Sequence, residues 1–310
     1  MEEAARFHLT SDFVVNAEEA GEVIDYDEKS KIMIVKYKSG KTKAISFDSN
    51  IVKNANGGFY LSNQLITKLK VGDKFKANDV LAYHKDFFTN DEFNDCRLNV
   101  GVLTKIAIMS LYNTYEDSTF ITQKLSEEAA TEMCFCKSVV VGKNSNVDFI
   151  VKKGSHITVG DPLISFDTSY EDDSINALLA NMGEQEKNLI LESSKNIISS
   201  KYSGVIEDIK IYAAVDLDEM SPSLKKIVSE KYKEINHKKN FLTKYDTENG
   251  SSVVVCGMFL NEAAKKTNPD AYGVIKGEKV EDSVLFEFYI KHSEPLEIGS
   301  KIANFTKSVW

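Results

Sequence analysis

The sequence predicts a mainly β protein of the α+β class, and three observations support this prediction. Short segments rich in β-branched residues alternate with polar turns at residues 14–17, 21–27 and 31–37. A turn pattern, in which two apolar residues flank a spacer and Gly-Asp or Gly-Ser follows, recurs at residues 69–75, 157–163 and 296–302. Only two stretches have the character of helices. Irregular spacing of the repeated turns favours a barrel or a barrel-sandwich built from hairpins over a solenoid.

The strands are predicted from apolar segments and the turns between them. Residues 38–41 separate two β-rich segments, and Gly40 can take the positive φ of a tight hairpin turn. Residues 100–109 form an apolar run bounded by turn-forming residues, which predicts a buried strand. Further strands are expected over residues 252–260 and 284–290.

Two helices are expected to interrupt the strands. Residues 173–182 form a short amphipathic segment with Asp173 or Ser174 as its cap and Gly183 as its stop. The second helix begins at Ser221, where a capping residue precedes Pro222. Apolar residues follow at helical spacing: Leu224, Ile227, Val228, Tyr232 and Ile235. Because its polar face is charged, we expect this helix to project or to pack lightly.

Composition limits the possible functions. With 310 residues and 42% hydrophobic residues, the chain can bury a sizeable core in two or three domains. A net charge of −9 argues against an independent nucleic-acid binder, so any such contact should be local. Arg97 stands out because Arg6 is the only other arginine. No apolar run approaches the about 20 residues that span a bilayer, and the start is acidic, which predicts an intracellular protein.

The cysteines do not predict a metal site, whereas two adjacent carboxylates predict a positive group beside them. The four cysteines include one Cys-x-Cys, which falls short of a zinc site and predicts free, partly buried thiols. Glu116 and Asp117 follow the apolar run of residues 100–109. Two adjacent carboxylates repel each other and need a cation or hydrogen-bond donors to stay ionised near a core. A positive group is therefore expected beside them.

Residues 102–109 together with Tyr115-Glu116-Asp117-Ser118 resemble the strand and the Phe/Tyr-Glu-Asp-Ser motif of the β subunit of multisubunit DNA-directed RNA polymerases. The order of further landmarks also resembles that family, at residues 11–27, 71–82, 120–125, 153–166, 203–209 and 286–301. The resemblance covers almost the whole chain but only the central-to-late part of a β subunit. A Lys- and Asn-rich sequence fits the divided subunits of virus-encoded (phage) relatives.

This resemblance implies a fold and a division of the chain. We expect part of a double-psi β-barrel with an inserted flap-like β-rich domain and short helices. Residues 1–125 would form the barrel and its adjoining β-region, residues 126–283 the flap-like insertion with a helical tip and a coiled-coil-like helix, and residues 284–310 the return strand. On the short helix, Leu178, Leu179 and Met182 would bind a promoter-recognition factor. A short helix that covers a core is the alternative for these residues.

The resemblance also implies chemistry, in which the RNA 3′ hydroxyl attacks the α-phosphate of a nucleoside triphosphate. Glu116 and Asp117 would act near the second Mg²⁺, directly or through water, and Lys301 would contact phosphate oxygens. A solvated strand end is the alternative for the two acids, and a plain exposed lysine is the alternative for Lys301. Arg97 would face the template or the nucleotide, and a plain surface arginine is its alternative. The partner large subunit, a β′-like chain, would supply the triple-aspartate loop and share the Mg²⁺, so the chain is not active alone.

Other implied partners are the remaining β fragments, template DNA, RNA and the promoter-recognition factor. No membrane is expected to be a partner. The expected location is the host cytoplasm or a virion. The chain departs from the family at Ser300, where an aspartate is usual, and it lacks the second lysine in a Gly-Asn-Lys-Gly setting. Two alternatives therefore stay open. One is a barrel-sandwich binding or carrier module, although the hairpin-tip lysine flanked by methionine or alanine is absent. The other is a scaffold protein that kept the barrel but lost activity.

Overall fold

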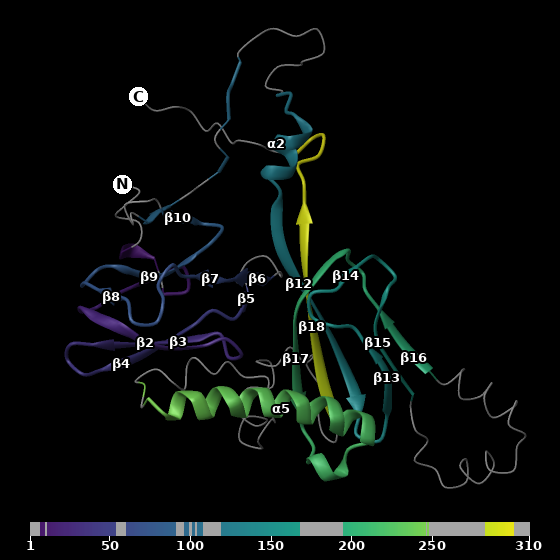
Figure 1. Cartoon of the computed structure of the whole chain (residues 1–310). Helices are drawn as coiled ribbons and strands as arrows, with labels where there is room; N and C mark the ends of the chain where they lie inside the picture. Colours follow the sequence, from purple (N-terminus) through teal and green to yellow (C-terminus); the bar gives the residue numbers. More distant parts are fainter. Residues whose placement is uncertain are drawn as a thin grey trace, which may run out of the picture.

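The computed structural model describes residues 7–9, 11–53, 60–90, 96–98, 101–102, 104–107, 119–167, 195–245, 247 and 283–300. Over these residues the protein is mainly β, with several antiparallel sheets and two α-helices (Figure 1). This confirms the predicted class. The described strands form no closed barrel.

Two small sheets, named here the amino-terminal sheets, come first along the chain. One has the order β4-β3-β2-β8, from β2 (Gly21–Asp27), β3 (Ile32–Tyr37), β4 (Thr42–Ser46) and β8 (Lys74–Phe75). The other has the order β1-β9-β7, from β1 (Val14–Asn16), β7 (Leu65–Ile66) and β9 (Val80–His84). Val23, Val35 and Leu81 share one buried core between them. A separate hairpin joins β10 (Phe88–Asn90) to β11 (Cys96–Leu98).

Two further sheets, named here the central sheets, form the largest part of the structure. The six-stranded order is β14-β17-β18-β12-β6-β5, from β5 (Asn50–Lys53), β6 (Tyr60–Asn63), β12 (Thr131–Gly142), β14 (His156–Ile157), β17 (Gly204–Ala213) and β18 (Ser283–Glu294). The three-stranded order is β13-β15-β16, from β13 (Asn146–Ile150), β15 (Pro162–Asp167) and β16 (Lys195–Ser199). Phe286, Phe288 and Leu163 belong to the core between them. The strand expected over residues 284–290 is confirmed within β18, whereas residues 252–260 lie outside the described residues.

The turns follow the sequence prediction closely. Gly40 has φ 90° in the β3–β4 hairpin, as predicted. In the repeated pattern, Gly72 and Gly160 have φ 92° and 95°, a region that glycine enters without steric cost. The next residue then caps the turn: a carboxylate oxygen of Asp73 accepts the Lys70 N–H at 2.8 Å, and one of Asp161 accepts the Thr158 N–H at 2.7 Å. At residues 297–300 the Ser300 hydroxyl accepts the Glu297 N–H at 2.9 Å.

The helices differ from expectation in number and packing. Helix α2 (Gln123–Glu128) is capped by Thr122 and was not predicted, and the helix expected over residues 173–182 lies outside the described residues. Helix α5 (Pro222–Thr243) begins where predicted, because the Ser221 hydroxyl caps its first turn. A short 3₁₀ helix (Leu217–Glu219) precedes it. None of the described helices is long and apolar enough to cross a membrane.

Two expectations about packing are wrong. Helix α5 does not pack lightly, because apolar side chains at both of its ends are buried: Leu224 and Val228 at one end, Phe241 and Leu242 at the other. The predicted buried strand over residues 100–109 is also wrong for its described part. Residues 101–102 and 104–107 form no strand, and the Ile106 side chain is 83% exposed, since no described strand pairs with this run.

Candidate functional site

Most of the predicted site residues lie outside the described part of the chain. These are Glu116, Asp117, Lys301, Leu178, Leu179 and Met182, and their roles stay predictions. Arg97 is described: it is exposed on β11, directly across from Thr89 on β10. Its proposed contact with template or nucleotide also stays a prediction.

The described residues contain a different candidate, a cleft of about 830 Å³. Its walls come from helix α5, from β13 and β17 of the central sheets, and from β1, β4 and the chain around Asp48. Ile150, Ile227 and Ile211 contribute apolar surface, while both lysines and carboxylates come from α5 and β17. A volume of this size matches the clefts that bind small molecules.

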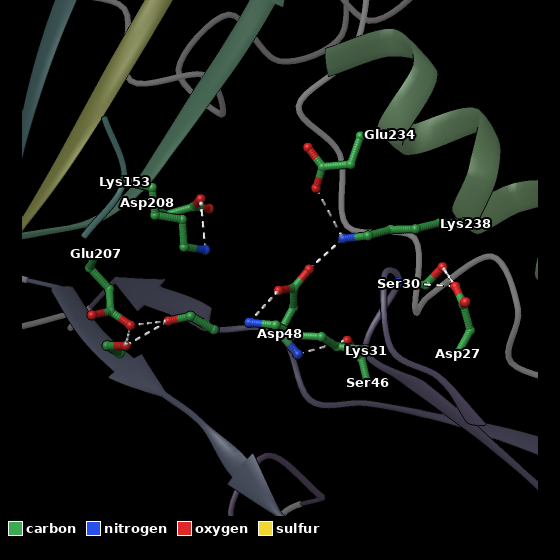
Figure 2. A network of polar contacts seen from close by, with 12 residues as sticks. Asp27, Ser30, Lys31, Ser46, Asp48, Lys153, Glu207, Asp208, Glu234 and Lys238 are labelled. Atoms are coloured by element: carbon green, nitrogen blue, oxygen red, sulfur yellow. Dashed lines mark hydrogen bonds and ion pairs between the residues drawn. The ribbon is translucent and has the colours of Figure 1, made fainter. Parts of the chain in front are cut away.

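Asp48 is the centre of the polar network in this cleft (Figure 2). It forms ion pairs with Lys238 of α5 and with Lys31, whose Nζ lies 3.8 Å from Asp48 Oδ1. Lys238 also reaches Glu234, one helical turn away, at 3.7 Å. Burial by itself would raise the pKa of Asp48, but the hydrogen bond and charge of Lys238 outweigh it and hold that pKa below its usual value. Asp48 is therefore held as a carboxylate, and it binds helix α5 through its ion pair with Lys238.

A second group of charges lies at β17 and at Lys153, which precedes β14; Asp208 and Lys153 of this group line the cleft. The Lys153 ammonium lies 3.3 Å from Asp208 Oδ1. Burial would lower the pKa of Lys153, but the charges of Asp208 and Asp48 outweigh it and raise that pKa. Glu207 Oε1 accepts hydrogen bonds from Ser49 at 2.8 Å and from Ser62 at 3.0 Å. The pairing register of β17 with β18 shifts between Ile206 and Asp208, which is where the two consecutive acids lie.

A buried carboxyl lies within the six-stranded sheet. Glu287 on β18 is 3% exposed and accepts a hydrogen bond from the Tyr289 hydroxyl at 2.8 Å. Its neighbours in register are Ser138 on β12 and Lys210 on β17. Burial raises the pKa of Glu287 although Tyr289 and Lys210 oppose that shift. The group is therefore held in an environment that disfavours its charge.

Two of the described cysteines, Cys134 and Cys136, have thiols that are not activated. Cys96 and Cys134 are buried and Cys136 is half-buried, all three without a disulfide, which confirms the free thiols expected there. Burial raises the pKa of Cys134 to about 12 and that of Cys136 to about 11. A thiol with so high a pKa is a poor nucleophile at neutral pH. Cys256 lies outside the described residues.

The described cleft is organised to hold parts of the chain together. Asp48, Lys238, Lys153 and Asp208 are each paired with an opposite charge. No group of three or more His, Cys, Asp or Glu side chains within the described ranges could hold a metal ion. The arrangement therefore supports binding or positioning, and the chemistry predicted from Glu116 and Asp117 depends on another part of the chain.

Sequence reasoning did not identify this network. Asp48 and Lys238 are 190 residues apart, and no spacing or motif connects them. The only available signal was the capped start of α5 at Ser221, which predicts where the charged helix begins but not what it meets.

Comparisons with protein-family models and curated proteins identified no relative of this chain. No family model matches the sequence, and no curated protein is significantly similar to it. The resemblance to polymerase β subunits therefore depends on the motifs and on their order along the chain.

Proposed function

We propose that this chain is a fragment of the β subunit of a multisubunit DNA-directed RNA polymerase, of the divided kind that phages encode. Its role is to contribute to nucleotide and second-Mg²⁺ binding in template-directed RNA synthesis. One observation carries the proposal: Tyr115-Glu116-Asp117-Ser118 occurs in its family order, after the Gly-Asp turn at residues 72–73 and before the one at residues 160–161.

The fold supports the proposal at a coarser level. The chain is mainly β, and the turns at Gly72 and Gly160 each lead into a strand. Strands β12 and β18 pair along their whole length, from Thr131 opposite Glu294 to Gly142 opposite Ser283. In the proposed division, β18 belongs almost entirely to the return strand, and it pairs with the first long strand of the flap-like insertion. The double-psi β-barrel and the domain division belong to the proposal.

In the proposed site, the donors fit the ion. Adjacent carboxylates at Glu116 and Asp117 offer the oxygen ligands that Mg²⁺ prefers. Bound there, the ion would neutralise charge that develops on phosphate oxygens. The two carboxylates would orient the ion or its water, and Lys301 would place a point charge against the phosphates. The partner large subunit completes the site.

The test is RNA synthesis by the assembled polymerase that carries Glu116→Gln with Asp117→Asn. We expect at least about a 100-fold loss, the scale on which removing preorganised charge reduces catalysis. The matched control is Glu127→Gln with Glu128→Gln, an adjacent acid pair exposed on α2, which should leave synthesis unchanged. Both variants should still co-purify with the subunit that bears the triple-aspartate loop.

Two outcomes would favour the alternatives. Unchanged RNA synthesis in an intact complex would indicate a scaffold that has lost its active-site role. Failure of the wild-type chain to co-purify with a polymerase large subunit would favour a barrel-sandwich binding module. The turn at Gly160, capped by Asp161, is the feature that such modules share with this chain.

A further inference from the structure

Helix α5 contacts two separate cores. Leu224 and Val228, in its first two turns, are buried in the core of the central sheets. Phe241 and Leu242, in its last turn, are buried with Ile32, Ile34 and Ala44 of the amino-terminal sheets. Figure 1 shows the helix running from the strands β13 and β17 to the strands β3 and β4. It therefore bridges two sets of sheets that also line the cleft.

The amino-terminal end of α5 is held by hydrogen bonds within a large core. The Ser221 hydroxyl, which caps the helix, donates to the Ser145 carbonyl at 2.7 Å. The Ser223 hydroxyl accepts the Val147 N–H of β13 at 2.9 Å. Ser221 is buried and Leu224 is fully buried. Breaking this end would expose apolar surface and leave polar groups of the core without partners.

The carboxyl-terminal end is held by polar contacts near the surface, over a small apolar cluster. Three aspartates of the amino-terminal region hold it: Asp48 pairs with Lys238, Asp27 with His237 at 2.9 Å, and Asp25 with the Tyr245 hydroxyl. The side chains of Lys238 and Asp48 are 16% and 31% exposed, and those of His237 and Asp27 are 48% and 21% exposed. Salt weakens the Asp48–Lys238 ion pair, and the apolar cluster beneath these contacts is smaller than the central core.

A second connection lies on the other side of the cleft and does not involve α5. Glu207 of β17 accepts the hydroxyls of Ser49 and Ser62, and Tyr60 of β6 pairs with Cys134 of β12. Strands β5 and β6 thereby join the six-stranded sheet at its edge. If the carboxyl-terminal end of α5 were released, the sheets would stay connected here.

We propose that α5 is a releasable clamp. Its carboxyl-terminal half, residues 235–243, detaches from the amino-terminal sheets while residues 224–229 stay in the central core. The pivot is the connection through β5 and β6, and the result of release is a wider cleft. The device is a property of the described fold and does not depend on the proposed polymerase activity.

The test is amide hydrogen exchange of the full chain, followed by mass spectrometry. Once detached, a helical segment this short loses the packing that stabilises it and opens, so its amides exchange in proportion to the population of the released state. We expect residues 235–243 to exchange at least about tenfold faster than residues 224–229. Raising the salt from about 0.05 M to about 0.5 M should widen this difference, because screening weakens the aspartate contacts.

Asp48→Asn removes the central charge of the clamp and should speed exchange in residues 235–243 about fivefold, with residues 224–229 unchanged. Lys238→Met removes the partner charge and provides a second variant with the same expected effect. The control is Asp218→Asn, which removes an ion pair of 2.7 Å with Lys225 at the other end of the helix. It should leave residues 235–243 unchanged.

The proposal is overturned if both halves of α5 exchange at the same rate in the wild-type chain. It is also overturned if Asp48→Asn and Lys238→Met speed both halves equally, which would indicate global unfolding, or speed neither. Faster exchange confined to residues 235–243, absent in Asp218→Asn, supports the clamp.

Discussion

Gly204→Ala tests whether the close approach of β17 and β18 leaves no room for a side chain. A Cβ atom at Gly204 would lie 2.2 Å from the carbonyl oxygen of Lys291, a main-chain atom of β18. That oxygen cannot rotate away, because Lys291 pairs with Val205 on one side and with Cys134 on the other. The strands would have to separate by about 1 Å, which disrupts this end of the ladder. Overpacking of this kind costs about 3 kcal/mol.

The assay is equilibrium unfolding in urea, with the free energy of unfolding compared between variants. Gly142→Ala is the control, because its Cβ would lie 3.5 Å from the Ser145 hydroxyl oxygen, an ordinary contact. We expect this control to stay within about 0.5 kcal/mol of the wild type. The reasoning is refuted if Gly204→Ala also unfolds within about 0.5 kcal/mol of the wild type.

Two further predictions follow from buried titratable groups. Because burial raises the pKa of Glu287 above its ordinary 4.5, the folded chain should lose stability as pH rises from about 4.5 through the raised pKa. Glu287→Gln should flatten that part of the stability–pH curve. The prediction is contradicted if the free energies of unfolding of the wild type and the variant differ by the same amount at every pH in this range. Cys134 and Cys136 should resist iodoacetamide at pH 8 in the folded protein and react after unfolding, as peptide mass spectrometry would detect; rapid labelling of the native Cys134 would count against the raised pKa.

The sequence predicted those features that depend on local chemistry. The β3–β4 hairpin was predicted because Gly40 can take a positive φ, and the start of α5 because Ser221 precedes a proline. The tight turns at Gly72 and Gly160 were predicted from the same chemistry, but the aspartates that cap them were not. Each signal lies within about four residues of the structure that it specifies.

Features that depend on distant contacts were missed or predicted wrongly. Whether residues 100–109 are buried depends on strands elsewhere in the chain, and the described part of this run is exposed around Ile106. The packing of Phe241 against Ile32 could not be predicted, because periodicity gives the apolar face of a helix but not its partner. The Asp48–Lys238 pair was missed for the same reason. Glu116, Asp117 and Lys301 stay predictions that only experiment on the complex can test.

The place of β18 in the six-stranded sheet has a consequence for how the chain folds. This strand lies between β12 and β17, yet it is synthesised after both of them. Until it emerges from the ribosome, both neighbours expose unpaired strand edges, and closing so long a loop is slow. The nascent chain is therefore open to aggregation until its late central strand is inserted.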